Sequence, residues 1–340
     1  MRMSKKILKL LFMAAVLMLY ACAGVTEESD AAPEYVFTYA DNQNEDYPTV
    51  QAARFFASQV SEKSEGRIEI KVYANGELGD EQSTIEQIRY GGIDFARVSL
   101  SSLTGYSGMA GILLLPYLYK DLEHMWNVLD GEIGEEVMDS FDGSGFEPLS
   151  WYDAGVRSFY FTKPVYSLAD MQGMNIRVQD VDLMKEMVEL LGANPVPAVY
   201  SDVYAALEVG TVDGAENNLP SYTAMEHYRV APYIFLDEHM RVPEMQIISS
   251  RTFEKLSEED QALIKECAEE SAQYERTLWK RFWSEAETKA LAEGAYEIYP
   301  NEEAMQEFRD AVSPLYEEYA SDYEVLLERI ENAYTGKENK

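Results

Sequence analysis

The sequence predicts an α/β protein built from two units, with one long helix that spans both. Three observations support this fold class. Strand-like and helix-like segments alternate from residue 36 to residue 100, the alternation restarts near residue 146, and a helical pattern runs unbroken from Ser257 toward Gly294. Strands separated by helix-length connections favour a parallel sheet with helices on its faces. A length of 340 residues fits two domains of about 150 residues each.

The first unit contains three expected strands and two expected helices. Residues 36–40 are apolar and strand-like, and 47–63 fit an amphipathic helix. Apolar and charged residues alternate over 68–72, which is typical of a half-buried strand. A short helix over 81–90 ends at two glycines, and 93–100 form a further strand. Ligands of such sheets bind in crevices beyond the carboxyl ends of the strands.

The second unit repeats the alternation of short apolar strands with helices that end at a glycine. Its expected strands cover residues 146–151, 157–161, 175–178, 234–236 and 246–250. Its expected helices cover 182–191, before Gly192, and 202–209, before Gly210.

The C-terminal part is expected to be helical. Ser257 followed by three acidic residues is a capped helix start. An apolar stripe then recurs at helical spacing, through Leu263, Cys267, Tyr274, Leu278 and Phe282. A helix that continues to Gly294 would be about 55 Å long, more than the diameter of a small domain, so we expect it to bridge the two units. A last helical region, 302–332, is interrupted near Pro314.

The N-terminal residues 1–21 are typical of a bacterial export signal, with basic residues before an apolar run too short to span a bilayer comfortably. The run ends in Leu19-Tyr20-Ala21-Cys22, which resembles a lipobox. We expect acylation of Cys22, with 22–33 as lipid anchor and tether; a plain signal peptide is the alternative. The predicted location is therefore exported and lipid-anchored, in the periplasm or on the outer face of the cell membrane.

The composition excludes several classes of function. With 61 acidic and 28 basic residues, a formal charge of −33 argues against nucleic-acid binding. Three histidines and two cysteines argue against a zinc site or a Cys/His nucleophile. Asp213 and Glu216 are conceivable as a glycosidase pair, but in a chain this acidic they carry no signal. We therefore predict no enzyme, no cofactor and no metal. Cys267 is expected to be a small buried residue on a helix.

A series of short stretches, read in order, carries a family resemblance. The stretches are 64–70 (SEGRIEI), 76–81 (GELGDE), 92–95 (GIDF), 154–157 (AGVR), 163–164 (KP), 173–178 (GMNIRV), 191–197 (LGANPVP), 203–217 (VYAALEVGTVDGAEN) and 256–261 (LSEEDQ). Together they resemble the solute-binding proteins of TRAP transporters, the DctP family, from about residue 36 to 330.

This resemblance implies a two-lobed clamp, like other periplasmic binding proteins, that closes on an anionic solute. Lobe one would comprise 34–154 with 243–282, and lobe two 155–242 with 283–336. The long helix would run along both lobes. The implied partners are a small carboxylate ligand and the small and large membrane subunits of a TRAP permease.

The resemblance also assigns three residues to the solute carboxylate. Arg177 matches the arginine that forms a paired salt bridge, Arg157 a second ligand-contacting arginine, and Asn217 an asparagine that hydrogen-bonds the same carboxylate. The residues themselves agree with these roles. Apolar neighbours on either side place Arg177 on the opposite face of its strand, and a guanidinium offers a planar fork that matches a carboxylate.

Three further residues are candidates for contact with other parts of the ligand. Glu81 aligns with a position that hydrogen-bonds ligand hydroxyls in sialic-acid-binding members, although an acid is favoured in the first turn of a helix anyway. Ser99 ends a strand and Tyr200 precedes a helix. Trp151 and Tyr152 could stack on a sugar face or pack in the core.

The expected ligand is a hexuronate such as glucuronate or galacturonate. The stretches 216–222 (ENNLPSY), 237–239 (DEH) and 242–244 (VPE) look most like members that take hexuronates. Sialic acid is less favoured, because Ser99 stands where that branch carries an acid. One alternative is a C4-dicarboxylate, with Arg97 or Arg241 as the second cation. Another is a sensor lipoprotein that presents its ligand to a receptor.

Overall fold

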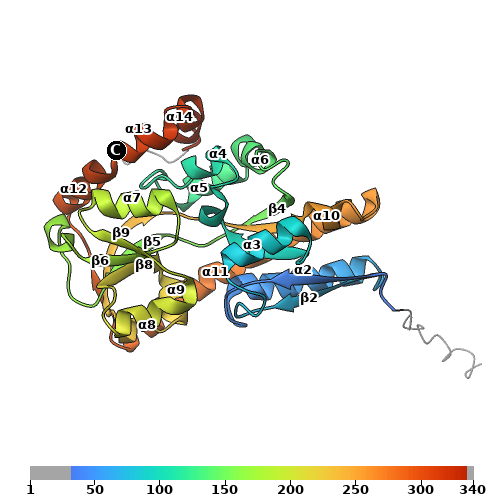
Figure 1. Ribbon diagram of the computed structural model, residues 1–340, viewed down its shortest axis with the longest axis horizontal. Helices are drawn as coiled ribbons and strands as arrows, with labels where there is room; N and C mark the ends of the chain where they lie inside the picture. Colours follow the sequence, from blue (N-terminus) through green and yellow to red (C-terminus); the bar gives the residue numbers. More distant parts are fainter. Residues whose placement is uncertain (1–31, 335–340) are drawn as a thin grey trace, which may run out of the picture.

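The computed structural model describes residues 32–334. The predicted export signal over 1–21, Cys22 and most of the tether over 22–33 therefore lie outside the described residues. Within the described residues, two β-sheets form the centres of two lobes that lie side by side (Figure 1). The two-lobed α/β fold predicted from the sequence is confirmed.

The sheet of lobe one has five strands in the order β2-β1-β3-β10-β4. Its strands are β1 (Tyr35–Ala40), β2 (Ile68–Tyr73), β3 (Phe95–Ser99), β4 (Phe146–Tyr152) and β10 (Glu244–Ser249). The sheet of lobe two has six strands in the order β11-β9-β5-β8-β6-β7. Its strands are β5 (Arg157–Phe161), β6 (Asn175–Val178), β7 (Asn194–Pro197), β8 (Gly214–Asn218), β9 (Tyr233–Met240) and β11 (Tyr296–Ile298).

The expectation of purely parallel sheets is wrong, because both sheets are mixed. In lobe one, β10 runs antiparallel to β3 and β4. In lobe two, β5 runs antiparallel to β8 and β9. The chain enters lobe two between β4 and β5 and returns to lobe one between β9 and β10. A strand that arrives from the other lobe needs no helical crossover over its own sheet, so nothing forces it to run parallel to its neighbours.

Most helices cover the faces of these sheets (Figure 1). The α-helices are α2 (Pro48–Lys63), α3 (Glu81–Tyr90), α4 (Gly108–Ile112), α5 (Leu122–Leu129), α6 (Glu132–Asp139), α7 (Asp182–Leu190), α8 (Val203–Glu208), α9 (Leu219–Ala224), α10 (Ser250–Phe253), α11 (Glu258–Ala292), α12 (Glu302–Val312), α13 (Pro314–Ala320) and α14 (Glu324–Asn332). Single 3₁₀ turns are η1 (Leu100–Leu103), η2 (Leu168–Met171), η3 (Tyr200–Asp202) and η4 (His227–Arg229).

The long helix α11 has 35 residues and a length of about 53 Å. The hydroxyl of Ser257 accepts a hydrogen bond from the Asp260 amide, as the capping motif predicts. The helix packs against α2 and β4 of lobe one and then against α9 of lobe two, so it bridges the lobes as expected. Cys267 is buried on this helix, as predicted. Tyr274 departs from the expected apolar stripe, because it is exposed and stacks on Phe55 instead.

The C-terminal helices contact both lobes. Helix α13 packs against α4 and α7, and α14 packs against α6 (Figure 1). A ring nitrogen of buried His124 lies 2.7 Å from the Ile330 carbonyl oxygen, and Arg329 forms a two-point ion pair with Glu136. The segment that follows α11 therefore spans the junction between the lobes. No helix among the described residues has both the length and the apolar character needed to cross a membrane.

Candidate functional site

A polar cavity of about 260 Å³ lies between the two sheets, with walls from both lobes. All six candidate ligand-binding residues from the sequence line it: Glu81, Ser99, Arg157, Arg177, Tyr200 and Asn217. Ser99 ends strand β3 and Asn217 lies near the end of β8, so the cavity sits where α/β sheets usually bind ligands. The sequence thus identifies residues that are distant along the chain but share one cavity.

Arg177 is a buried cation of the lobe-two wall, with only 2% of its surface exposed. It sits on β6, where it pairs with β8 at Ala215. Its Nε and Nη2 donate to the Ala198 carbonyl oxygen at 2.9 and 2.5 Å. Within residues 32–334, Arg177 forms no ion pair, and its Nη1 has no hydrogen-bond acceptor. Burial lowers the pKa of Arg177 from its ordinary value, and the attraction of nearby Glu216 offsets this only in part.

Arg157 lies on the neighbouring part of the same wall but has a partner. Its Nε and Nη2 form a two-point ion pair with the Glu216 carboxylate, with an Nη2–Oε1 distance of 2.8 Å. Both side chains are buried. Burial alone would raise the pKa of Glu216, but Arg157 and His239 outweigh it and lower that pKa to about 2. Only Nη1 of Arg157 lacks an acceptor among the described residues.

Behind this ion pair, a series of buried polar side chains in contact with one another extends to strand β9. His239 Nε2 lies 3.7 Å from Glu216, and its Nδ1 lies 2.9 Å from Asp237. Burial lowers the pKa of His239, but the two carboxylates outweigh that effect and raise it to about 9. Asp237 also accepts from the Phe159 amide at 3.2 Å. These contacts hold the Arg157 guanidinium in one orientation.

Asn217 supplies an uncharged donor next to the two arginines. Its Oδ1 accepts from the Asn218 amide at 2.8 Å, which leaves the amide nitrogen Nδ2 as the group able to donate, and Asn217 lines the cavity. No acceptor for Nδ2 is present in the part of the chain that the structure describes. Asn218 also lines the cavity, but its Oδ1 caps α9 by accepting from the Ser221 amide at 2.7 Å. The Tyr200 hydroxyl donates to the Ser221 carbonyl oxygen at 3.2 Å.

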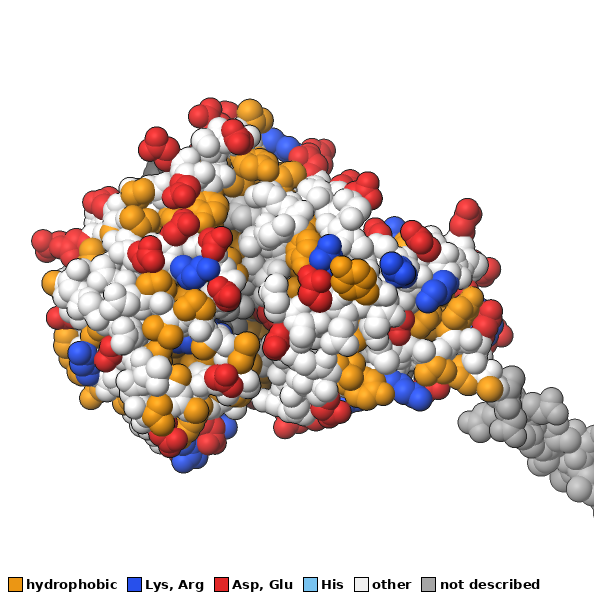
Figure 2. Space-filling view, viewed as in Figure 1, with side chains coloured by type: hydrophobic (Ala, Val, Ile, Leu, Met, Phe, Trp, Pro, Cys, Tyr) orange, Lys and Arg blue, Asp and Glu red, His pale blue; other side chains and the backbone are white. Residues whose placement is uncertain are grey.

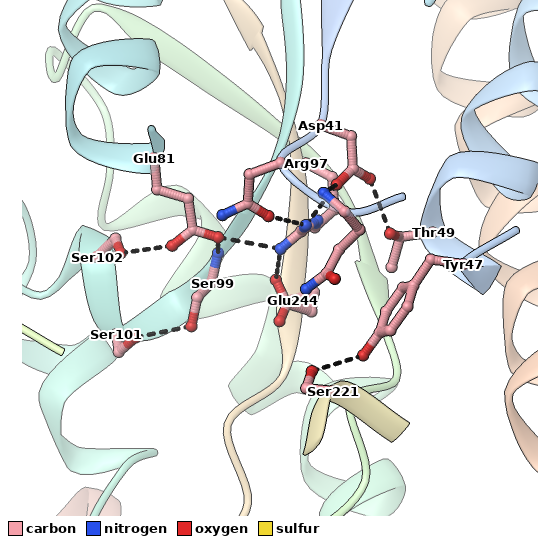
Figure 3. Close-up of polar contacts among 12 residues, drawn as sticks. Asp41, Tyr47, Thr49, Glu81, Arg97, Ser99, Ser101, Ser102, Ser221 and Glu244 are labelled. Atoms are coloured by element: carbon pink, nitrogen blue, oxygen red, sulfur yellow. Dashed lines mark hydrogen bonds and ion pairs between the residues drawn. The ribbon is translucent and has the colours of Figure 1, made fainter. Parts of the chain in front are cut away.

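The lobe-one wall is acidic and is organised around Arg97 (Figure 3). Asp80 caps α3 by accepting from the Ser83 amide, so Glu81 begins that helix and reaches the cavity. Glu81 accepts from Arg97 Nη1 at 3.0 Å, and also from Ser102 Oγ at 2.9 Å. The Ser99 hydroxyl pairs with that of Ser101 at 2.7 Å (Figure 3).

Side-chain hydrogen bonds join the lobes beside the cavity, including a 3.5 Å contact from the Tyr47 hydroxyl to Asn218 Oδ1. The Tyr47 hydroxyl lies 2.8 Å from the Ser221 hydroxyl of α9 (Figure 3). The Ser101 hydroxyl donates to the side-chain oxygen of Gln179 at 3.0 Å. The lobes are therefore in contact around the cavity.

Neither arginine named as a possible second cation is available at the cavity, and of the two alternatives for Trp151 and Tyr152, core packing holds. Arg97 is no spare cation, because three carboxyl groups surround it. Arg241 does not line the cavity. Trp151 and Tyr152 are buried core residues away from the cavity wall, and the Tyr152 hydroxyl lies 2.5 Å from that of Ser271.

Several lining residues are absent from the sequence-based candidates. Asn42 follows β1 and Gln179 follows β6, so a search of residues just beyond strand ends could have found them. Glu244 opens β10, where the chain returns from lobe two; the sequence marks it only as the end of the 242–244 stretch and not as a residue of the cavity. Among the described residues, no group of three or more His, Cys, Asp or Glu side chains is arranged to hold a metal ion. Asp213 accepts from the Asn175 amide at 2.9 Å, and neither Asp213 nor Glu216 lines the cavity.

The outer surface differs from the cavity in charge. Figure 2 shows acidic side chains spread over the visible face, with fewer basic ones between them. An acidic protein repels anions on average, so an anion-binding cavity needs cations held where the surrounding dielectric is low. Arg177 and Arg157 meet that requirement.

Two lobes that enclose a small polar cavity, with a short connection between β4 and β5, define a solute-binding protein of the clamp type. The chain belongs to the family described as bacterial extracellular solute-binding protein, family 7 (DctP), whose model matches residues 39–322. This match confirms the resemblance seen in the sequence.

Known relatives agree with this assignment. A solute-binding protein of Chromohalobacter salexigens is 37% identical over 292 residues, which cover 84% of this chain and 86% of the relative. A TRAP periplasmic solute-binding protein of Bradyrhizobium sp. BTAi1, solved in complex with α/β-D-galacturonate, is 40% identical, with a TM-score of 0.84 over 87% of this chain and 99% of that one. One from Pseudomonas putida F1, solved with D-glucuronate, is 34% identical, with a TM-score of 0.86 over 89% and 98%.

Proposed function

We propose that this protein is the solute receptor of a TRAP transporter and binds a hexuronate through its carboxylate. One observation carries the proposal. The lobe-two wall presents three donors without acceptors among the described residues: Nη1 of Arg177, Nη1 of Arg157 and Nδ2 of Asn217. Charge-assisted hydrogen bonds from guanidinium groups are the strong form of carboxylate recognition.

The size and polarity of the cavity support a small sugar acid. Drug-sized ligands occupy pockets of about 300–1,000 Å³, and this cavity measures about 260 Å³. Opposite the arginines, Glu81 and Ser99 offer acceptors and hydroxyls for the sugar hydroxyls. The similar proteins of Bradyrhizobium and Pseudomonas, solved with galacturonate and glucuronate, point to the same ligand class.

A C4-dicarboxylate is a weaker candidate on the same grounds. Of the three arginines that line the cavity, Arg97 is engaged by acids, Arg157 is paired with Glu216, and only Arg177 lacks an ion pair among the described residues. One uncompensated cation balances one carboxylate.

Closure of the two lobes is the proposed mechanism. We assign residues 34–154 with 243–282 to lobe one and 155–242 with 283–336 to lobe two, in keeping with the sheet to which each strand belongs. A ligand that touches both walls binds the closed form more tightly than the open form, and this difference in affinity drives closure. The protein then releases its ligand unchanged to the small and large membrane subunits of the permease, without catalysis or a cofactor.

Lipid anchoring through Cys22 is part of this proposal and depends on the sequence alone. The lipobox at residues 19–22 supports acylation, and a polar tether would leave the lobes free to reach the permease. Intact-mass measurement of the membrane-extracted protein tests it: a diacylated or triacylated N-terminal cysteine is expected, and an unmodified chain would contradict it.

Isothermal titration calorimetry of residues 23–340 tests the ligand assignment. D-glucuronate or D-galacturonate should bind, and succinate and malate should bind at least a hundredfold more weakly. Arg177→Ala should cost several kcal/mol, because a buried carboxylate loses its partner, and Arg177→Lys should also weaken binding, since an ammonium cannot replace the fork. Arg54→Ala is the control, because Arg54 is half-exposed and pairs with Glu45 outside the cavity. Tight binding of malate, or binding by Arg177→Ala within threefold of wild type, would contradict the proposal.

A further inference from the structure

We propose that Arg97 turns the lobe-one wall into a surface that accepts hydroxyls, on which Glu244 selects a sugar mono-acid over a sugar diacid. The inference rests on the proposed function, because it names the second half of the same ligand. It assigns Glu244, which is not among the ligand-binding residues predicted from the sequence, as a determinant of specificity.

Arg97 has no accessible donor left for a ligand carboxylate. Its Nη1 donates to Glu81 at 3.0 Å and to Glu244 at 2.8 Å. Its Nη2 donates to Asp41 and Asn42 at 2.5 and 2.6 Å (Figure 3). Each terminal nitrogen carries two hydrogens, so these four contacts use them all. The remaining Nε is buried without a partner among the described residues.

The three carboxyl groups around Arg97 outnumber its single charge. Asp41 is withdrawn from the cavity, because it is buried and also accepts from Thr49 at 2.7 Å (Figure 3). Glu81 and Glu244 line the cavity. This wall is therefore acidic, whereas the opposite wall carries the unpaired Arg177.

Glu244 differs from Glu81 in the acceptors it has free. Each oxygen of Glu81 already accepts a hydrogen bond within the protein, Oε1 from Arg97 and the Ser99 amide, and Oε2 from Ser102. Glu244 accepts from Arg97 through Oε2, and its Oε1 has no donor among residues 32–334. A ligand hydroxyl can fill that site and form a charge-assisted hydrogen bond.

The two walls together describe the ligand. A carboxylate at one end meets Arg177, and hydroxyls at the other end meet Glu244. A second carboxylate at the hydroxyl end would face Glu244 and Glu81 across a cavity that holds no cation free to neutralise it among the described residues. Like charges in such surroundings repel strongly, so an aldarate is excluded although its length and hydroxyls resemble those of a uronate.

Calorimetry with D-glucuronate and D-glucarate tests the inference. In the wild type, we expect the Kd for D-glucarate to exceed that for D-glucuronate at least a hundredfold. Glu244→Gln keeps the shape and an oxygen for Arg97 but removes the charge, so this Kd ratio should fall at least tenfold. D-gluconate, which is acyclic like D-glucarate but has one carboxylate, separates the effect of charge from that of ring opening.

Two further variants control the measurement. Glu77→Gln makes the same change of net charge at an exposed position outside the cavity and should leave the ratio unchanged. Glu81→Gln should change the ratio less than Glu244→Gln, because each Glu81 oxygen already has a donor within the protein, whereas Glu244 Oε1 has none among the described residues. Circular dichroism establishes that each variant is folded.

The outcomes separate this inference from the proposed function. Wild-type binding of D-glucuronate with an unchanged ratio in Glu244→Gln would overturn the inference and leave the proposed function standing. The opposite outcome is also possible: the wild type binds no hexuronate but prefers D-gluconate to D-glucarate, and this preference falls in Glu244→Gln. That result would overturn the hexuronate proposal and support the inference. A wild type that binds D-glucarate as tightly as the mono-acids would overturn the inference directly.

Discussion

Arg157 and Glu216 form a two-point ion pair between the paired strands β5 and β8, and both side chains are buried at the cavity wall. The pair orients a cation toward the ligand without leaving its full charge uncompensated in the empty protein. Arg177 lacks such a partner among the described residues, which is why we propose it as the main attraction for an anionic ligand.

Glu216→Gln is expected to destabilise the protein by about 3–5 kcal/mol, because it leaves the buried Arg157 charge without its counterion. Urea unfolding at pH 7 measures the change. Glu45→Gln breaks the pair with Arg54, in which both partners are about half exposed, and should cost less than about 1 kcal/mol. Equal losses in the two variants would show that the buried pair contributes no more than a surface one.

The stability contributed by Glu216 should disappear in acid. Its pKa in the folded protein is lowered from 4.5 to about 2. A carboxyl with a lowered pKa stabilises the fold above its unfolded pKa, and that contribution is lost as the pH falls from 4.5 toward 2. The difference in unfolding free energy between wild type and Glu216→Gln should therefore shrink across this range. A difference that stays constant from pH 6 to pH 3 would contradict the assignment.

Glu244→Gln should raise the melting temperature of the empty protein at pH 8 but not at pH 4.5. Burial, with the neighbouring Glu81, outweighs the attraction of Arg97 and raises the pKa of Glu244 from 4.5 to about 7. A carboxyl with a raised pKa favours the folded state most below pH 4.5, and this contribution is lost as the pH rises through 7. Glutamine cannot ionise, so the variant keeps the unfolding free energy, on the order of 1–3 kcal/mol, that the wild type loses when Glu244 ionises. A lower melting temperature for the variant at pH 8 would mean that the ionised Glu244 stabilises the fold.

Gly155→Ala should weaken both stability and ligand affinity. Gly155 lies in the connection between β4 and β5 with a φ of +64°, and a Cβ there would lie 2.5 Å from Cζ3 of Trp283 on α11. Gly66→Ala is the matched control, because Gly66 has a φ of +79° and no atom within 4 Å of its added Cβ. The control should lose only about 1 kcal/mol of unfolding free energy, the cost of a residue with a Cβ at a positive φ. Equal effects of the two substitutions in urea unfolding would exclude a role for the Trp283 contact.

Tyr47→Phe should favour the open form of the clamp. It removes the hydroxyl that meets Ser221 beside the cavity, while the ring stays packed against Trp279 and Phe282. A lost hydrogen bond of about 1 kcal/mol corresponds to a three- to tenfold weaker Kd for the hexuronate. Tyr166→Phe, at a 60% exposed residue, should leave the Kd unchanged. Small-angle X-ray scattering should show a larger radius of gyration for Tyr47→Phe without ligand, and an unchanged radius with an unchanged Kd would refute the prediction.

Local patterns predict the elements whose apolar spacing or caps are regular. Helix α3 over Glu81–Tyr90 and strand β6 over Asn175–Val178 have the predicted bounds. Strand β8 over Gly214–Asn218 carries no strand signal, because glycine and asparagine disfavour strands, and only pairing with β5 and β6 on both sides makes it one. The predicted helix over 202–209 is α8 over Val203–Glu208, shorter by one residue at each end, and the 3₁₀ turn η3 precedes it.

The residues of the candidate site also fall into two groups, those that a local motif predicts and those that only tertiary contacts bring to the cavity. Arg177, Arg157 and Asn217 stand in motifs whose order along the chain identifies the family, and all three line the cavity. The role of Arg97 could not be predicted, because its partners Asp41, Glu81 and Glu244 come from three separate parts of the chain. Glu244 reaches the cavity only because β10 returns from lobe two to pair with β3.

The sequence by itself determined the two-unit α/β architecture, the long bridging helix, the family and the cations that line the cavity, because periodicity, capping and ordered motifs are local properties of the chain. The tertiary structure alone decided which charges remain available. Arg97, Arg157 and Arg177 are the same residue type in similar buried positions, yet three carboxyl groups surround the first, one pairs with the second, and none among the described residues pairs with the third. Electrostatic interactions depend on distance in space and on burial, and the pairing of strands from distant parts of the chain sets both.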